Sequence, residues 1–163
     1  LYYAVQPLLK YIPKDWNIWC PFDAEWSAFY YTFKDNGYNV MRSHIDEGQD
    51  FFEYEPDNYD VIVSNPLYNV KDDILKRLYE LNKPYAMLLP ISCLQSGKRF
   101  EYLEGVQLLS FDKRISFHTL EEMNVVKANK STPFATAYFC KNILPKDLIL
   151  ERLNKFDKAL IEE

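Results

Sequence analysis

The segment from Asp60 to Tyr68 constrains the fold of this chain more than any other part of the sequence. Its three consecutive β-branched residues, 61–63, predict a buried strand, and the strand is followed at once by Asn-Pro-Leu-Tyr. Residues 70–81 then carry apolar side chains at helical spacing. Ligands bind at the carboxyl ends of the strands of an open α/β sheet. This strand, turn and helix therefore predict a parallel sheet with a ligand site beside residues 65–68.

The rest of the chain continues the alternation of strands and helices. We expect helices at residues 2–12, 25–36 and 146–161, and strands at residues 17–20, 39–45, 85–91, 106–111 and 134–140. Residues 50–52 are a turn or a short strand, and Asp23 or Ser27 is the expected cap of the second helix. The fold class that follows is α/β and Rossmann-like, with a mostly parallel twisted sheet and helices on both faces. The last two strands are expected to form an antiparallel hairpin at one sheet edge.

Length and composition limit the kinds of protein that this chain can be. A chain of 163 residues with 48% hydrophobic residues predicts a single folded domain over residues 1–163. No apolar run reaches the roughly 20 residues of a membrane span, and no signal peptide is recognisable. Three widely spaced cysteines without CxxC pairs predict reduced thiols, a cytoplasmic protein and no metal site. The net charge of −5 argues against avid non-specific binding to nucleic acid, although a local basic rim remains compatible with it.

The turn at residues 65–68 combines groups that suit chemistry on a flat, amine-bearing substrate. The lone pair of an exocyclic amine is delocalised into its ring, so the nitrogen is a poor nucleophile until acceptors engage its N–H groups. The side-chain oxygen of Asn65 and the carbonyl of Pro66 are the natural acceptors, and Tyr68 is placed to stack on the ring. The alternative is an ordinary turn in which Asn and Pro serve only as turn formers. Residues 119–133, a long polar connection, are expected to lie as a loop over this site.

The order of these segments resembles the class I S-adenosylmethionine-dependent methyltransferases. It is most similar to the amino-methyltransferases that carry an Asn/Asp/Ser-Pro-Pro-Tyr/Phe signature, which stands here as Asn65-Pro66-Leu67-Tyr68. The chain also resembles small phage-encoded adenine methyltransferases, through Trp-Cys-Pro-Phe-Asp at 19–23 and Ser-His-Ile at 43–45. The resemblance implies transfer of a methyl group to adenine N6 of DNA or RNA, with S-adenosylmethionine as cofactor. Asn65, Pro66 and Tyr68 would be the catalytic residues.

The resemblance also implies where the cofactor and the substrate would bind. The implied cofactor site lies after the first strands and comprises Pro21, Phe22, Asp23, Glu25, His44, Asp46, Asp50, Phe51 and Ser64. Asp23 or Glu25 would meet the methionine ammonium and His44 or Asp46 the ribose. Asp50 would meet the adenine amine, with Phe51 beside the ring. The basic pairs Lys98-Arg99 and Lys113-Arg114 are candidates for phosphate contacts at the rim, with solvated surface charge as the alternative.

Two departures from the family pattern keep other functions open. Leu67 stands where the family has a second proline, and the loop at 21–27 has no glycine, whereas the family's first loop is normally glycine-rich. These departures favour, as an alternative, a catalytically inactive methyltransferase-like module for binding or assembly. A further alternative is a methyltransferase that acts on a protein amide such as Gln. The length leaves no room for a separate target-recognition domain, so we expect loose specificity, a partner protein or homo-oligomer that supplies it, or a longer natural chain.

Overall fold

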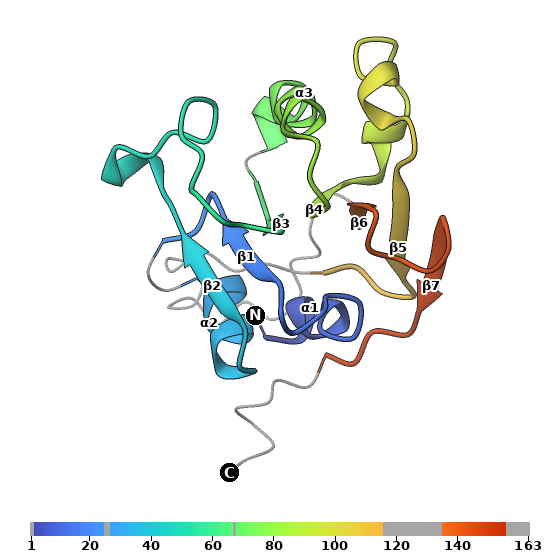
Figure 1. The fold of residues 1–163 in the computed structure, drawn as a ribbon. Coiled ribbons are helices and arrows are strands. Elements are labelled where there is room, and N and C mark those ends of the chain that lie inside the picture. Colours follow the sequence, from blue (N-terminus) through green and yellow to red (C-terminus); the bar gives the residue numbers. More distant parts are fainter. Residues whose placement is uncertain (1, 25–26, 67, 116–134, 156–163) are drawn as a thin grey trace, which may run out of the picture.

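One sheet of seven strands organises the protein in the computed structural model, which describes residues 2–24, 27–66, 68–115 and 135–155. The strand order is β2-β1-β3-β4-β6-β5-β7 (Figure 1). The strands are β1 Asn17–Cys20, β2 Asn39–Arg42, β3 Val61–Ser64, β4 Tyr85–Pro90, β5 Gln107–Phe111, β6 Thr136–Lys141 and β7 Leu148–Glu151. The pairs among β1 to β4 are parallel, β6 is antiparallel to β4 and β5, and β7 is parallel to β5. The α/β, mostly parallel, Rossmann-like sheet is therefore confirmed.

Helices cover both faces of this sheet, as expected. The α-helices are α1 Tyr2–Val5, α2 Ala28–Asp35 and α3 Lys71–Leu81. Short 3₁₀ turns are η1 Gln6–Leu8, η2 Ile45–Glu47, η3 Tyr68–Val70, η4 Ile91–Leu94 and η5 Phe100–Leu103. Figure 1 shows α1 and α2 on one face and α3 on the other. Alternate residues of each central strand pack into two separate apolar clusters: Ile18 and Cys20 join the α1 and α2 side, and Trp19 joins the α3 side.

Local sequence signals explain where the two longer helices begin and end. The Ser27 hydroxyl accepts a hydrogen bond from the Phe29 N–H at 3.2 Å and caps α2, so the cap is Ser27 rather than Asp23. Gly37, at φ +83°, follows this helix in a left-handed conformation. Asn82 takes the same conformation after α3 and donates its N–H to the Leu78 carbonyl. The expected helix at 2–12 is shorter than predicted, because it passes into η1 at Gln6.

The closing helix expected at residues 146–161 is wrong where the structure describes it, because Leu148–Glu151 is strand β7. The Gln107 side chain accepts from the N–H groups of Ile143 and Leu144 and donates to the Leu144 carbonyl. This turn brings the following residues alongside β5, where the Leu108 N–H donates to the Asp147 carbonyl at 2.7 Å. The sheet therefore continues one strand beyond the β5–β6 hairpin. Residues 156–161 of the expected helix lie outside the described residues, as does the expected loop at 119–133.

No helix in the described part of the chain is both long and apolar enough to cross a membrane. Within the same residues, no group of three or more His, Cys, Asp or Glu side chains is placed to hold a metal ion. Cys20, Cys93 and Cys140 are free and buried. Residues 50–52 form a turn rather than a strand.

Candidate functional site

The strand β3 delivers Asn65 and Tyr68 to the carboxyl edge of the sheet. Ser64 is the last strand residue, Asn65 is half-buried, Pro66 is buried, and Tyr68 opens the 3₁₀ turn that leads into α3. The Tyr68 hydroxyl donates a hydrogen bond to Asn65 Oδ1 at 3.1 Å. The predicted amide and aromatic ring are therefore joined in one unit rather than merely adjacent in sequence.

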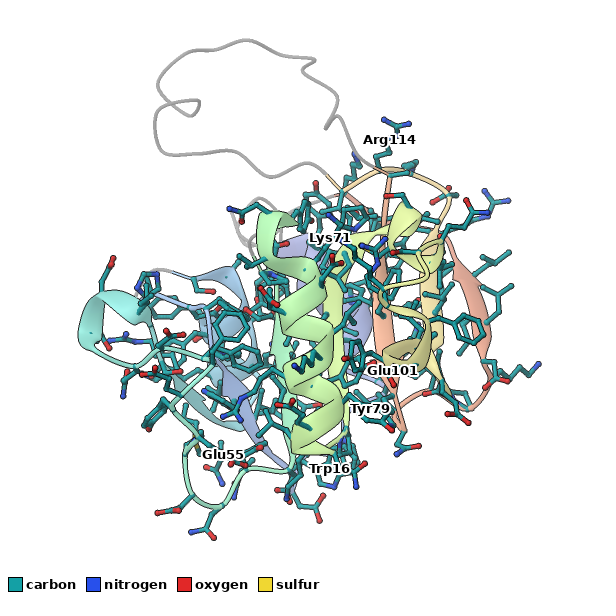
Figure 2. The ribbon with its side chains drawn as sticks, turned by 90° about the horizontal axis from the view of Figure 1, so that it is seen from above. Trp16, Glu55, Lys71, Tyr79, Glu101 and Arg114 are labelled. Carbon is teal, nitrogen blue, oxygen red and sulfur yellow. The ribbon has the colours of Figure 1, made fainter. Side chains whose placement is uncertain are left out.

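Basic side chains lie at this same end of the molecule. Figure 2 shows Lys71, at the start of α3, and Arg114, after β5, at one end of the sheet, with Trp16 at the opposite end. Arg114 and Lys98 are exposed, and Lys71 is half-buried, with its Nζ 3.5 Å from the Tyr68 carbonyl oxygen to which it donates. Lys113 donates to the Leu153 carbonyl at 3.3 Å. Lys71 and Arg114 therefore lie at the edge of the sheet where β3 ends, in a protein whose net charge is negative.

Burial keeps the Tyr68 hydroxyl protonated. It raises the pKa of Tyr68 to about 12, with a smaller contribution from the nearby Cys93 thiol. Cys93 is buried in η4, directly after β4, and was not predicted as a site residue. Its position was accessible to sequence reasoning, because the carboxyl ends of neighbouring parallel strands meet at one edge. At neutral pH the Tyr68 hydroxyl is thus a hydrogen-bond donor held between Asn65 and the η4 turn.

Asp23 links the turn after β1 to the end of β3. The Ser64 hydroxyl donates to Asp23 Oδ1 at 3.0 Å, whereas Oδ2 has no hydrogen-bond partner among the described residues. Asp23 is only 5% exposed, and this burial raises the pKa of its carboxyl. Ser27, Ser64, Cys20 and the Tyr30 backbone lie close enough to lower the pKa in turn, although none of them bonds Oδ2. The result is a buried carboxyl group with one unsatisfied oxygen, an unusual arrangement that suits a cationic ligand.

Phe22, in the turn that follows β1, packs against Phe51 on the α3 side of the sheet. Their ring centroids are 4.9 Å apart, and Phe51 also packs against Trp19 at 5.5 Å. The Asp50 carboxylate accepts from the Phe52 N–H at 3.0 Å, which closes the turn that presents Phe51. The structure thus brings together two of the predicted cofactor residues, and it gives Asp50 a role in the backbone of the same turn.

His44 and Asp46 lie together after β2. The His44 Nδ1 accepts from the Asp46 N–H at 3.1 Å and lies 3.4 Å from the Asp46 carboxylate. The Asp46 side chain is 86% exposed, and that of His44 is 27% exposed. Pro21 is buried in the turn that follows β1, and Glu25 lies outside the described residues. The ribose candidates therefore form a pair, but no contact joins them to Asp23.

Arg99 corrects one expectation, because it is a structural residue rather than a rim cation. It is 7% exposed and donates to the Cys93 carbonyl from Nε at 3.0 Å. A second guanidinium nitrogen pairs with the Asp72 carboxylate at 2.5 Å, which lowers the pKa of that carboxyl through the hydrogen bond and the positive charge. Arg99 therefore fastens the η4 turn to the first turn of α3, and only Lys98 of this pair is exposed.

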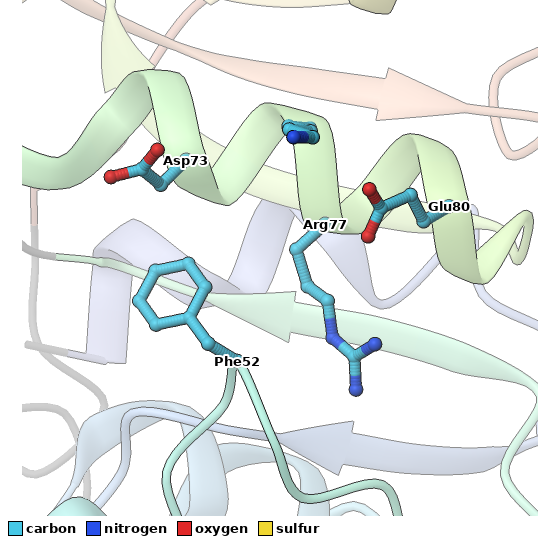
Figure 3. Close-up of a pocket in the computed structure, with 5 residues that line it drawn as sticks. Phe52, Asp73, Arg77 and Glu80 are labelled. Carbon is cyan, nitrogen blue, oxygen red and sulfur yellow. The ribbon is translucent and has the colours of Figure 1, made fainter.

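A cavity of about 260 Å³ lies between α3 and the turn that carries Phe52 (Figure 3). It is lined by Phe52, Asp73, Lys76, Arg77 and Glu80, and none of the predicted site residues belongs to it. Arg77 Nε donates to the Phe51 carbonyl at 3.1 Å, so this side of α3 anchors the Phe51 turn. With two acids and two bases, the cavity has no evident preference for one charge.

No protein-family model matches the chain, and no curated protein matches its sequence. The chemistry of the site must therefore be read from its own residues. An amide oxygen and a tyrosine ring at the end of β3, with a buried carboxyl group beside them, can hold a planar amine next to a cationic group.

Proposed function

We propose that the chain is an S-adenosylmethionine-dependent methyltransferase that acts on an exocyclic amine, namely adenine N6 of DNA or RNA. The observation that carries this proposal is the Asn65–Tyr68 unit at the carboxyl end of β3, directly after Ser64, whose hydroxyl donates to the buried Asp23. Asn65 and Tyr68 are suited to bind an amine, and the Asp23 carboxyl group is suited to bind a cation. Both lie at the same edge of the sheet. That edge is the ligand-binding edge of open α/β folds.

The amine side of the proposal rests on Asn65, Pro66 and Tyr68. Asn65 Oδ1 and the Pro66 carbonyl would accept hydrogen bonds from the amine, which favours a more pyramidal and more nucleophilic nitrogen. Fixed dipoles of this kind contribute several kcal/mol in a site that excludes water. Stacking of a base on Tyr68 would add roughly 1–3 kcal/mol. In duplex DNA the base must first leave the helix, and Lys98 and Arg114 are suitably exposed for the flanking phosphates.

The cofactor side rests on Asp23. S-adenosylmethionine carries an ammonium group, and the buried Oδ2 of Asp23, which has no partner within the described part of the chain, is a fitting partner for it. Phe22 and Phe51 would line the cofactor, and His44 with Asp46 is the pair placed for its ribose hydroxyls. When bound, S-adenosylmethionine supplies an electrophilic methyl group. The task of the chain is then to orient the amine in line with that group and to exclude water.

The second candidate function is a catalytically inactive binding or assembly module. The loop that follows β1 favours this candidate. Residues 21–24 carry a side chain at every position, with Pro21 and Asp23 buried, so the backbone offers no glycine for a close approach to a cofactor. Calorimetry with S-adenosylmethionine separates the two functions. Saturable binding supports the enzyme, and no heat of binding at millimolar cofactor supports the inactive module.

Substitution of Asn65 tests the proposed catalytic role. We expect Asn65→Ala to abolish methyl transfer while it retains the fold and binds S-adenosylmethionine, because Asn65 is half-buried and outside both apolar clusters. The matched control is Asn69→Ala, an exposed asparagine in the same turn, which should keep its activity. Transfer of a labelled methyl group into DNA, RNA and protein pools distinguishes adenine from a protein amide as acceptor. Full activity of Asn65→Ala would show that the assigned role is wrong.

We also propose the cytoplasm as the compartment, since three buried free thiols suit a reducing environment. A nucleic-acid acceptor would require target specificity from a partner protein or from a second copy of the chain. Size-exclusion chromatography of the protein, alone and with an oligonucleotide, tests the second copy directly.

A further inference from the structure

We propose that the Tyr68 hydroxyl is a positioning group that fixes the Asn65 side-chain amide with its oxygen toward the substrate, and so selects a base that bears an amine over one that bears a carbonyl. This inference rests on the proposed function and adds a residue that determines specificity. Its basis is the hydrogen bond from the Tyr68 hydroxyl to Asn65 Oδ1 at 3.1 Å.

An asparagine amide has an acceptor end and a donor end of almost the same shape. Rotation by half a turn exchanges them, and the group that faces a substrate changes from acceptor to donor. The Tyr68 hydroxyl removes this ambiguity, because a half-buried hydroxyl that stays protonated needs an acceptor. Asn65 Oδ1 provides one lone pair to Tyr68 and keeps a second for an incoming amine N–H.

The tyrosine is itself held in place. Its carbonyl oxygen accepts from Lys71 at 3.5 Å, and its side chain packs against the apolar cluster that includes Cys93. On the other side, Ser64 is fully buried and bonded to Asp23. The backbone is therefore held on both sides of Asn65 and the Tyr68 hydroxyl holds its side-chain oxygen, which is the preorganisation that a selective site requires.

The consequence concerns which bases fit. Adenine presents an amine at the position where hypoxanthine presents a carbonyl, and the two bases otherwise have nearly the same outline. A carbonyl oxygen facing Asn65 Oδ1 finds no donor, and turning the amide to offer Nδ2 would break the bond to Tyr68. A site that hydrogen-bonds one group rejects an analogue without it, because its own polar atoms are then left unpaired.

The test uses single-stranded oligodeoxyadenosine and oligodeoxyinosine as probes, so that base extrusion does not enter. Affinity for both is measured by fluorescence anisotropy with wild type, Tyr68→Phe and Tyr38→Phe. We expect Tyr68→Phe to lower the preference for adenine about 3- to 10-fold, the usual effect of one hydrogen bond. Tyr38→Phe is the matched control, since its hydroxyl bonds the Leu9 and Ile12 carbonyls and its residue lies just before β2, at the opposite end of the sheet. This control should leave the preference unchanged.

A second arm asks whether the hydroxyl acts through the amide. In an Asn65→Asp background both oxygens are acceptors, so we expect Tyr68→Phe to change the preference less than about 2-fold. An equal loss in both backgrounds, or no loss in either, would overturn the proposal. Because anisotropy needs no methyl transfer, a wild type that transfers no methyl group, together with the expected losses in the two backgrounds, refutes the enzyme and leaves this inference supported. Equal binding of both probes by wild type refutes the inference alone.

Discussion

Asp23 gives the sharpest prediction, because its burial costs the free protein stability that a ligand would restore. We expect Asp23→Asn to stabilise the free protein at neutral pH and to weaken binding of S-adenosylmethionine. The substitution keeps the shape and the Oδ1 acceptor for Ser64, and it removes a charge that is 5% exposed with Oδ2 unsatisfied. The amide nitrogen that replaces Oδ2 is still buried, so the gain comes only from removing the buried charge, and we expect about 1 kcal/mol.

The pH dependence of this gain has a definite sign. Folding raises the pKa of Asp23 above its ordinary value of 3.8. Below that value the carboxyl group is neutral in the folded and in the unfolded chain, and the aspartate costs nothing. As the pH rises through 3.8 the unfolded chain loses its proton first, so wild-type stability falls until the pH passes the raised pKa of the folded state. The advantage of Asp23→Asn should therefore be small near pH 4 and largest at neutral pH and above.

Urea denaturation between about pH 4 and about pH 8 measures this difference, and about 1 kcal/mol corresponds to a rise in Tm of about 2–4 °C for a chain of this size. The exposed Asp57 provides the control, since Asp57→Asn should change stability by less than about 0.5 kcal/mol at every pH. We expect added S-adenosylmethionine to raise the Tm of the wild type and to raise that of Asp23→Asn less. A variant less stable than wild type at pH 8, or a gain independent of pH, would refute the reasoning.

Two further predictions follow from buried groups. Arg99→Met should destabilise the protein by about 2 kcal/mol in urea denaturation, since the Cys93 carbonyl and the Asp72 carboxylate lose their donor. The control Lys98→Met should change the stability by less than about 0.5 kcal/mol. Equal effects of the two variants would contradict the structural role of Arg99. All three cysteine thiols should react slowly with a thiol reagent in the native protein and rapidly in denaturant, and prompt reaction of a native thiol would contradict their burial.

The sequence predicted the elements whose pattern is decided locally. Strand β3 has β-branched residues and α3 has a continuous apolar side that includes Ile74 and Leu78, and both lie within a residue or two of the expected positions. Ser27 was identifiable as a helix cap because it directly precedes apolar residues at helical spacing. Such signals depend only on residues a few positions apart, so they can be recognised in the sequence without knowledge of tertiary contacts.

Other features depend on partners far along the chain and could not be predicted. Residues 148–150, Leu-Ile-Leu, suit a helix or a strand equally, and pairing with β5 decides the outcome. The burial of Arg99 could not be predicted, because it depends on an ion pair with Asp72, which lies 27 positions earlier in the sequence. The hydrogen bond from Tyr68 to Asn65 spans only three positions, yet it depends on the turn that Pro66 and its neighbours adopt.

The burial of β3 on both faces limits which residues of the strand and of the following turn can be substituted during evolution. All four residues of β3, 61–64, are fully buried. Ile62 packs on the α3 side of the sheet, and Val61 and Val63 pack on the α1 and α2 side. A substitution in β3 therefore disturbs the packing of one of these faces. The positions just beyond, Asn65 and Tyr68, are only half-buried and belong to the turn. We therefore expect the turn residues to tolerate exchange without loss of the fold, while the strand itself is confined to a narrow set of side chains.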